Sequence, residues 1–424
     1  MKVELAYGRT GLVIDVPADR TTVVLPRQLD AVANERHAVQ AALRHPTAGP
    51  PLRDRIRAGQ TVAISMCDGT RPQPRNVMIP ALLDELDGIV RPDDVVVLVA
   101  TGTHRGNTPR ELQSMLGADV LDRVRVVNHD ASDPAALRWI GRFAGDVPVW
   151  LHRAWVDADV RITTGFVEPH FFAGFSGGPK LVAPGLAGLD TVLALHDARR
   201  IGDPRATWGV TVGNPVHDAV REIAEVTGVD FAVDVLLDRR HRIVEVFSGD
   251  LPAEHAAACR AARRMAMVAV PAEFDVVVTT NAGFPLDQNL YQCVKGMSAG
   301  AAVVRQGGTL VCAAECRDGF PDHGSYREVL ASQPTPAALL RTIEARRVPL
   351  PDQWQVQVQC RVQARARVLL HTSGLTTAEL AAAHIESAAD VSATVREELA
   401  RLGPDATVCV LPEGPQTIAY VEAQ

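Results

Sequence analysis

The chain has 424 residues and a formal net charge of −7, and aromatic residues make up only 4% of it. This length is enough for two or three domains with sizeable cores. The acidic balance argues against nucleic acid or an anionic membrane surface as the main partner, so we expect the ligand to be a small molecule.

In the first 270 residues, apolar strands, polar loops and helices alternate. The expected strands lie within residues 2–26, 61–68, 94–100, 156–167, 230–238 and 243–250. The expected helices cover residues 29–44, 76–86, 189–200, 213–227 and 252–268, and one more begins near Thr108. This alternation predicts a parallel α/β sheet that binds ligands at the carboxyl ends of its strands.

A change in composition at Pro271 marks the start of a second α/β unit. Its expected elements are strands at 274–281, 307–315 and 406–412, a helix around 288–305 and helices near 376–402. The fold class is therefore α/β, with two α/β domains that have largely parallel sheets. We place the boundary so that the domains are residues 1–270 and 271–424.

The seven cysteines are scattered, and none forms a C-x-x-C pair. We expect reduced, mostly buried thiols and no zinc knuckle. The first 17 residues lack a basic region followed by an apolar core, and no run approaches the ~18 apolar residues of a membrane helix. A cytoplasmic protein is expected.

Residues 165–196 are the stretch best suited to binding. They contain His170, Lys180, His196 and several glycines, and they lack the periodicity of a long helix or a simple strand. Within this stretch, the segment AGFSGGPK allows backbone amides to approach an anion such as phosphate. It is not a P-loop, because Pro179 precedes the lysine and no serine or threonine follows it.

Lysine is scarce in this chain. Of the 43 basic residues only Lys2, Lys180 and Lys295 are lysines, so arginine is used wherever a positive charge is sufficient. An ε-amine can form covalent bonds and shift its pKa, which a guanidinium does not do readily. Lys180 and Lys295 are therefore candidates for chemical roles, with chance retention as the alternative.

Other chemically useful side chains follow the expected strands. Asp68, Arg71 and His104 lie at strand ends, and the fork of Arg71 suits a carboxylate or a phosphate. His104 and His170 can serve as a pair of general acid/base groups, since imidazole titrates near neutral pH. Later in the chain three polar side chains share one face of an expected helix: Tyr291, Gln292 and Lys295.

These motifs together resemble a known family. They are D-G-T-R (68–71), A-T-G-T-H-R (100–105), P-H-F-F-A-G-F-S-G-G-P-K (169–180), the histidine at 196 and Y-Q-C-V-K-G (291–296). In this order and spacing, the chain resembles the nickel-dependent lactate racemase family, which comprises 2-hydroxyacid racemases and epimerases that use a nickel pincer nucleotide. The resemblance covers nearly the whole chain.

The resemblance implies a cofactor, nickel-pyridinium-3,5-bisthiocarboxylic acid mononucleotide. His196 matches the histidine that binds nickel, in keeping with the tetragonal preference of Ni(II). Lys180 matches a lysine that can join one arm of the cofactor as a thioamide. The other positions that the resemblance assigns to cofactor binding are Thr101, Thr103, Gly174, Ser176, Gly177 and Gly178.

The resemblance also implies the reaction, which is racemisation or epimerisation of a 2-hydroxy acid. Hydride moves reversibly to the cofactor through a transient 2-keto acid, and His104 and His170 serve as acid and base. The implied substrate-binding residues are Asp68, Arg71, Tyr291, Gln292 and Lys295. Residues 1–270 would then bind the cofactor and carry catalysis, residues 271–424 would add substrate contacts, and the active site would lie in the cleft between them.

The partners implied by the resemblance are a small 2-hydroxy acid and the proteins that synthesise the nickel nucleotide. A homo-oligomer is possible, and neither nucleic acid nor a membrane is expected. Two alternatives remain open. One is a zinc-dependent hydrolase that uses the same three histidines, although the sequence shows no H-E-x-x-H. The other is a non-catalytic protein that binds a nucleotide or cofactor on the glycine-rich segment.

Overall fold

The computed structural model describes residues 1–321 and 324–422. The chain divides into two compact units. The N-terminal unit consists of residues 28–196 and 205–265, and the C-terminal unit consists of residues 1–27, 197–204 and those from Ala266 onward. Each unit is an α/β structure built on a six-stranded sheet, which confirms the expected fold class.

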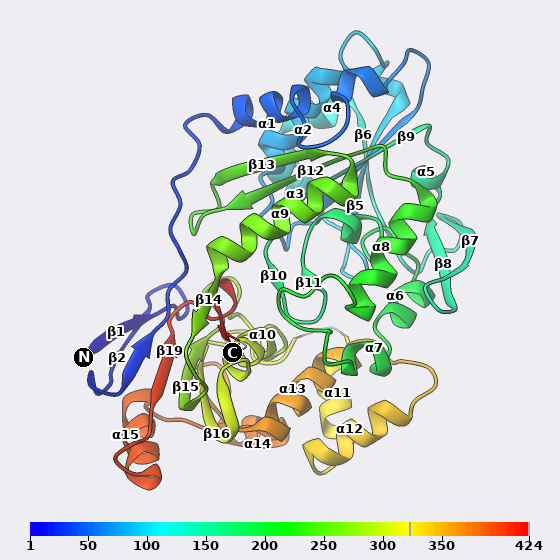
Figure 1. Ribbon diagram of the computed structural model, residues 1–424. Helices are drawn as coiled ribbons and strands as arrows, with labels where there is room; N and C mark the ends of the chain where they lie inside the picture. Colours follow the sequence, from blue (N-terminus) through cyan, green and yellow to red (C-terminus); the bar gives the residue numbers. More distant parts are fainter. Residues whose placement is uncertain (322–323, 423–424) are drawn as a thin grey trace. The chain divides into compact units, whose positions relative to one another are not determined.

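The sheet of the N-terminal unit has the strand order β13-β12-β9-β4-β5-β6. In this order its strands are Ile243–Gly249, Phe231–Leu237, Val160–Phe166, Val62–Cys67, Val95–Ala100 and Arg125–Asn128. Figure 1 labels five of these strands, β13, β12, β9, β5 and β6. All neighbouring strands are parallel except β12 and β13, which pair antiparallel. Every residue of β4 is buried, as is usual for a parallel strand that is covered on both faces.

Helices cover both faces of this sheet. The helices of the unit are α1 Glu35–Arg44, α2 Arg75–Leu86, α3 Pro109–Leu116, α4 Ala118–Arg123, α5 Arg153–Val156, α6 Leu189–Leu195, α8 Pro215–Thr227 and α9 Leu251–Ala266. Alternate residues of a strand point to opposite faces, so neighbours on β4 enter different cores. Ile64 packs with Val39 and Leu82 from α1 and α2. Ala63 belongs to the second core, with Leu195 and Ile223 from α6 and α8.

Two predicted helices of this unit differ from the structure at their boundaries. The helix expected over 29–44 begins only at Glu35, because Asn34 caps it by accepting from the amide of His37. The helix expected over 189–200 is interrupted after Leu195. A new helix, α7 Ala198–Gly202, starts there because the Asp197 side chain caps it. His196 therefore lies at a helix end.

The expected start of a helix near Thr108 is confirmed. Thr108 accepts from the amide of Glu111, and the Glu111 carboxylate accepts from the amide of Thr108, so the two form a reciprocal capping box. Pro109 occupies the first helical position, where its missing N–H costs nothing.

The sheet of the C-terminal unit is entirely parallel, with the order β18-β17-β16-β15-β19-β3. In this order its strands are Glu386–Ser387, Ala366–His371, Val304–Ala313, Phe274–Thr280, Val408–Leu411 and Thr21–Val23. Its longer helices are α10 Leu290–Ala301, α11 Tyr326–Ala331, α12 Pro336–Ala345, α13 Gln353–Arg365, α14 Thr377–Ala382 and α15 Val391–Leu402. Two-stranded pairs complete the unit: β1 Lys2–Leu5 with β2 Leu12–Asp15, and β14 Met267–Val270 with β20 Ile418–Val421.

The first residues of the chain belong to the C-terminal unit, which differs from a single division at residue 270. The reason is β-sheet pairing, since β3 joins the edge of this sheet beside β19 with Thr22 opposite Cys409. Leu5 and Ile14 of the β1–β2 hairpin also pack into its core with Val395 of α15. The last of the four divisions of the chain, between residues 265 and 266, lies close to the expected boundary.

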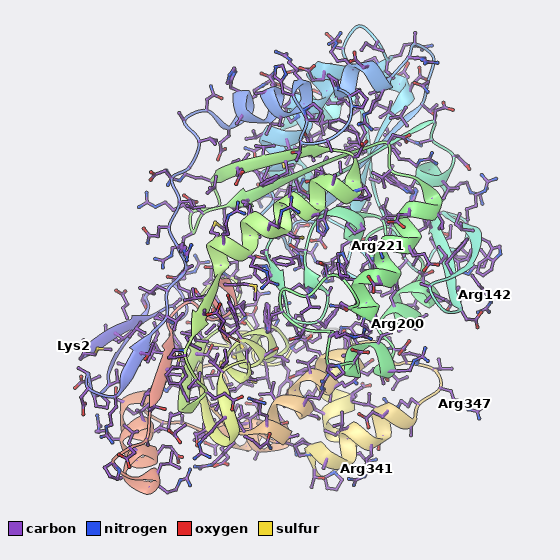
Figure 2. The ribbon with its side chains drawn as sticks, in the orientation of Figure 1. Lys2, Arg142, Arg200, Arg221, Arg341 and Arg347 are labelled. Atoms are coloured by element: carbon purple, nitrogen blue, oxygen red, sulfur yellow. The ribbon has the colours of Figure 1, made fainter. Side chains whose placement is uncertain are left out.

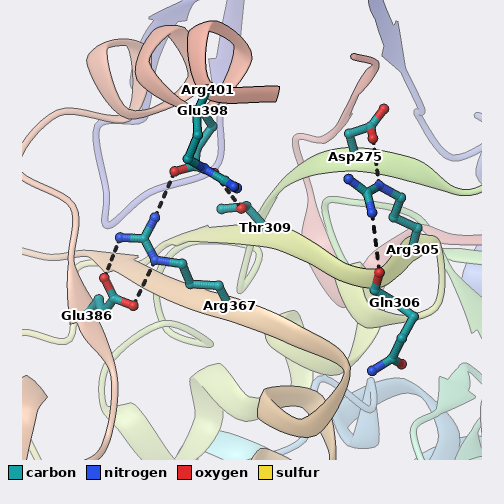
Figure 3. Close-up of polar contacts among 8 residues, drawn as sticks. All are labelled: Asp275, Arg305, Gln306, Thr309, Arg367, Glu386, Glu398 and Arg401. Carbon is teal, nitrogen blue, oxygen red and sulfur yellow. Dashed lines mark hydrogen bonds and ion pairs between the residues drawn. The ribbon is translucent and has the colours of Figure 1, made fainter. Parts of the chain in front are cut away.

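A buried carboxylate connects α15 to this sheet (Figure 3). Glu398 of α15 is only 5% exposed, and it accepts from the Thr309 hydroxyl of β16 at 2.7 Å. It also accepts from Arg367 of β17 and from Arg401 one turn later, each at 2.7 Å. Two guanidinium groups and a hydroxyl thus compensate a charge that would be costly to bury alone.

The surface carries mostly arginine as its basic residue. Exposed side chains such as Arg142 and Arg341 extend away from the ribbon (Figure 2). All seven cysteines are buried free thiols, as expected. Within residues 1–321 and 324–422, no helix is both long and apolar enough to cross a bilayer.

Candidate functional site

The first part of the site lies where β4 and β5 end. Asp68 follows β4 directly, and the turn that leads to His104 follows β5. Because these strands are parallel neighbours, their carboxyl ends lie at the same edge of the sheet. Asp68 Oδ2 is 2.6 Å from His104 Nδ1. The structure therefore brings together two residues that the sequence placed at separate strand ends.

The Asp68 carboxylate is 3% exposed and ionised. Burial by itself would raise its pKa, but the hydrogen bond and charge of His104, the charge of Arg71 and the Thr70 hydroxyl hold the pKa well below its usual range. An ionised carboxylate can only accept, so His104 carries a proton on Nδ1. In the neutral ring, Nε2 then keeps its lone pair, as a general base requires.

Arg75 is a residue of this region that the sequence argument missed. Its Nη1 donates to the carbonyls of Asp68 and Arg71, each at 3.0 Å, and so holds the D-G-T-R turn against the start of α2. A cavity of about 440 Å³ opens beside this turn and is lined by Asp68, Thr70 and Arg75, among others. The signal that could have revealed Arg75 is its position four residues after Arg71, at the start of a helix.

His170 lies in a short hairpin formed by β10 Pro169–His170 and β11 Gly174–Phe175. The amide of Ala173 donates to His170 Nδ1 at 3.2 Å. Since that amide can only donate, the neutral His170 ring carries its proton on Nε2. The two expected acid/base histidines are therefore held in opposite tautomers, His104 as a base at Nε2 and His170 as a donor at Nε2.

His196 ends α6 and is 9% exposed. Its Nδ1 donates to the Val192 carbonyl at 2.8 Å, so in the neutral ring the lone pair is on Nε2, the atom suited to binding a metal ion. The Phe172 ring lies edge-on to both His196 and His170, with ring centroids 5.4 Å and 4.5 Å apart. The structure thus gathers the expected metal ligand and one acid/base histidine around one aromatic ring.

Lys180 lies in a short 3-10 helix, Gly178–Leu181, at the end of the glycine-rich segment. The expectation that amides of this segment receive an anion is not met at two positions. The amide of Ser176 donates to the Glu168 carbonyl at 2.9 Å, and that of Gly178 donates to Asp234 Oδ2 at 2.7 Å. These two amides already have protein acceptors, and cofactor binding by the other residues of the segment stays a prediction.

The two threonines of the A-T-G-T-H-R motif differ in their surroundings. The Thr101 hydroxyl is buried and donates to the His129 carbonyl at 2.6 Å, so it supports the turn that leads to His104. Thr103 is exposed. Cofactor binding by either residue stays a prediction.

The remaining predicted residues lie in the C-terminal unit, on α10. Asn289 caps this helix by accepting from the amide of Gln292. Lys295 Nζ donates to Gln292 Oε1 at 2.9 Å, in keeping with the shared helical face that their spacing predicts. The Tyr291 ring packs edge-on against Tyr326, with centroids 5.3 Å apart.

Four buried polar residues beneath the glycine-rich segment were not predicted. They share the property that each is hydrogen-bonded to the backbone of residues 172–178, and they are Asn214, His217, Asp234 and His255. The sequence held one signal for them, an aspartate in the middle of the apolar strand FAVDVLL, where a buried charge needs a reason.

We expect Asp234→Asn to change how stability depends on pH. Burial raises the pKa of Asp234, so the folded chain keeps this proton over a range where the unfolded chain has lost it. Stability is then lost as the pH rises above ~4, the ordinary pKa of aspartic acid. As the pH is raised from about 5 to about 8, the difference in free energy of unfolding, Asp234→Asn minus wild type, should increase by at least about 1 kcal/mol. Urea unfolding measures this difference, and a value that is constant with pH would contradict the raised pKa.

The zinc-hydrolase alternative requires three histidines to gather around one ion. In the part of the chain that the structure describes, no group of three or more histidine, cysteine, aspartate or glutamate side chains is arranged to hold a metal. A site in which one histidine completes the coordination of a metal that is already bound to a cofactor does not need such a group.

Comparison with known proteins gives matches over nearly the whole chain. Residues 7–209 match the family described as "Lactate racemase N-terminal domain", and residues 269–419 match "Lactate racemase C-terminal domain". The lactate racemase of Thermoanaerobacterium thermosaccharolyticum is 33% identical and covers 98% of each chain. That of Lactiplantibacillus plantarum is 32% identical, over 97% of this chain and 98% of the relative.

Comparison with solved structures agrees with the sequence matches. The lactate racemase apoprotein from Thermoanaerobacterium thermosaccharolyticum superposes with a TM-score of 0.91 at 32% identity, over 99% of this chain and 100% of that one. A protein from Thermotoga maritima shares the fold, with a TM-score of 0.68 at 18% identity over 93% of this chain and 100% of that one.

Proposed function

Since the chain belongs to the lactate racemase family and is thus an isomerase of hydroxy acids, we propose that it inverts C2 of a 2-hydroxy acid by reversible hydride transfer with a nickel pincer nucleotide. The observation that carries this proposal is that His104 Nδ1 faces the Asp68 carboxylate while His170 Nδ1 faces the Ala173 amide, an arrangement that favours opposite tautomers of the two rings. Inversion through a planar ketone needs one group that takes the hydroxyl proton and another that returns a proton after the ketone turns over.

Asp68 sets the first of these roles. Its carboxylate accepts from His104 Nδ1 and stabilises the imidazolium that forms when His104 takes the substrate hydroxyl proton at Nε2. His170 Nε2–H, held in place by the backbone amide of Ala173, donates to the substrate oxygen from a second position. As His170 returns a proton there, it regains one from the His104 imidazolium by way of solvent, so both rings end neutral. When the other enantiomer reacts, the same proton path runs in reverse.

The residues present fit the implied cofactor. His196 offers an Nε2 lone pair fixed in direction by its bond to Val192, and an imidazole nitrogen is a suitable ligand for nickel. Lys180 provides an amine that can hold the cofactor covalently or pair with one of its anionic groups. When bound, the cofactor accepts the hydride from C2 and returns it, which avoids removing a very weakly acidic C–H proton.

Four residues are proposed to hold the substrate. Arg71 presents a fork that matches a carboxylate, and Lys295 adds a second cation. Gln292 accepts from Lys295 Nζ and so directs that amine, while Tyr291 offers a phenol hydroxyl. The proteins that synthesise the nickel nucleotide are the proposed partners, because this chain must be loaded before it can act.

The test follows the C2 hydrogen during turnover in D2O. The protein is produced together with the cofactor-synthesis proteins and assayed by chiral chromatography on lactate and a panel of larger 2-hydroxy acids. Under hydride transfer, the inverted product should stay largely protiated at C2. Wholesale deuterium incorporation at C2 would overturn the mechanism, and the absence of inversion on every acid, with nickel bound, would overturn the proposed function.

Covalent attachment is tested separately by the intact mass of the denatured, loaded protein. An added mass that disappears in Lys180→Ala supports a covalent link. Bound nickel without any added mass means that Lys180 only pairs with the cofactor.

A further inference from the structure

The glycine-rich segment rests on a layer of buried polar side chains. We call Asn214, His217, Asp234 and His255 the loop supports. They come from three different elements, namely the beginning of α8, the middle of β12 and the first half of α9. Each is at most 5% exposed.

The loop supports bond to the segment at four successive points. Asn214 Nδ2 donates to the Phe172 carbonyl at 2.9 Å, and His217 bonds to the backbone of Ala173. His255 Nε2 lies 2.9 Å from the Ser176 carbonyl, to which it donates, and the Gly178 amide donates to Asp234 Oδ2 at 2.7 Å. The supports thus hold both N–H and C=O groups of the backbone within residues 172–178.

The fit between segment and supports leaves no room for side chains. A Cβ added at Gly178 would lie 2.5 Å from the His255 ring, and one at Gly177 would lie 2.9 Å from Asp234 Oδ1. Both glycines have positive φ, 73° at Gly177 and 50° at Gly178, which disfavours other residues. The glycines therefore serve close contact with the supports.

The two imidazoles are neutral donors in this layer. Burial lowers the pKa of His217 to about 3, helped by its electrostatic interactions with His255 and Lys180. Burial likewise lowers the pKa of His255 to about 4, against its bond to Ser176. Their rings stack with centroids 5.5 Å apart, and the Cys259 thiol lies 3.8 Å from His255 Nδ1. A neutral His255 with its proton on Nε2 matches these contacts.

Two buried carboxyl groups lie in or beside this layer, those of Asp234 and Glu254. Burial raises the pKa of Asp234, and burial together with the Asp234 carboxylate raises that of Glu254, which neighbours His255 on α9. The Glu254 carboxyl group makes no side-chain hydrogen bond among the described residues, and its contact with the Asp234 backbone only partly offsets the effect of burial on its pKa. The layer beneath the segment is therefore nearly neutral.

We propose that the loop supports are positioning residues, which fix residues 172–178 and thereby set where Lys180 and His170 lie. The parts played by Lys180 and His170 rest on the proposed function. Catalytic groups must be held within about half an ångström, and loops do not provide this on their own. Here the supports anchor the loop to one strand and two helices.

The scarcity of lysine makes the proposal measurable in the protein without cofactor. Lys2, Lys180 and Lys295 are the only lysines, so acetylation of each amine can be followed by peptide mass spectrometry. Amide hydrogen exchange of residues 172–178 is measured on the same samples. The first variant is His255→Leu, which removes the donor to Ser176, and its partner is His255→Gln, whose amide can donate from nearly the same place.

In His255→Leu, we expect amide exchange of the segment and acetylation of Lys180 relative to Lys2 each to become about tenfold faster. His255→Gln should stay near the wild-type rates. The exposed His37→Leu on α1 is the control and should change neither rate. If His255→Leu does not fold, Asn214→Asp replaces it, because a carboxylate still caps α8 while the donor to Phe172 is lost.

The proposal is overturned if the segment exchanges at the wild-type rate in His255→Leu or Asn214→Asp, even when their thermal stability falls. It is also overturned if His255→Gln behaves like His255→Leu, since the hydrogen bond would then not be the cause. These measurements do not depend on the reaction. A failure of the D2O test would remove the proposed function while leaving the anchoring of the loop as measured.

Discussion

His104→Ala and His170→Ala should each lower turnover by about 10³-fold while the fold and the nickel content stay unchanged. Each variant removes one of the two groups that move the hydroxyl proton, and inversion needs both. The measurement is kcat for both enantiomers by chiral chromatography, with circular dichroism and nickel analysis on the same samples. Substantial activity in either variant would contradict the assignment of two acid/base histidines.

A half-reaction separates the two histidines. In His170→Ala, the enantiomer whose hydroxyl faces His104 should still yield the 2-keto acid in a single turnover quenched with acid, and the other enantiomer should not. His104→Ala should show the reverse preference. The exposed His37→Ala is the matched control and should retain full inversion. Equal yields from both enantiomers in either variant would mean that one histidine serves both faces.

His196→Ala should reduce the nickel content of protein produced together with the cofactor-synthesis proteins at least about tenfold, and activity should fall with it. The variant removes the Nε2 lone pair that the bond to Val192 directs. Phe172→Leu is the matched control, since it removes the ring beside His196 but leaves the nitrogen donor. Wild-type nickel content in His196→Ala would show that another group supplies the protein ligand.

Much of the fold could be predicted because local patterns agree with the final structure. The apolar runs of β4 and β5 are long enough for strands, and the box formed by Thr108 and Glu111 marks a helix start. The boundaries were less accurate. Asn34 starts α1 later than its apolar spacing suggested, and Asp197 divides a helix that the spacing joined.

In the candidate site, too, some features could be predicted from the sequence and others could not. The sequence placed Asp68 and His104 at strand ends of an alternating α/β pattern, and the structure brings the two side chains together because those strands are neighbours. The tautomers of His104 and His170 could not be derived, because they depend on which group faces each ring. The Asp234 carboxylate was overlooked because a single charge in an apolar strand has no local partner to explain it.

The helix α13 shows why some elements lie beyond local reasoning. Its sequence QWQVQVQCRVQAR alternates glutamine with apolar residues, yet it forms a helix with buried glutamines at 353, 355, 357 and 359. Gln357 donates to the Ala198 carbonyl at 2.7 Å and Gln359 to the Ala383 carbonyl at 2.8 Å. These acceptors are distant in the chain, so only tertiary contacts compensate the burial of the amides.

By itself, the sequence determined the α/β class, the residues available for chemistry and the strand ends that carry them, because these depend on periodicity and on side-chain type. The tertiary structure alone decided that residues 1–27 join the C-terminal unit, that β13 runs antiparallel, and that the amides of Ser176 and Gly178 face protein acceptors. Hydrogen-bond partners set these features. A partner on another element, as Asp234 is for Gly178 and Cys409 is for Thr22, leaves no trace in the local pattern.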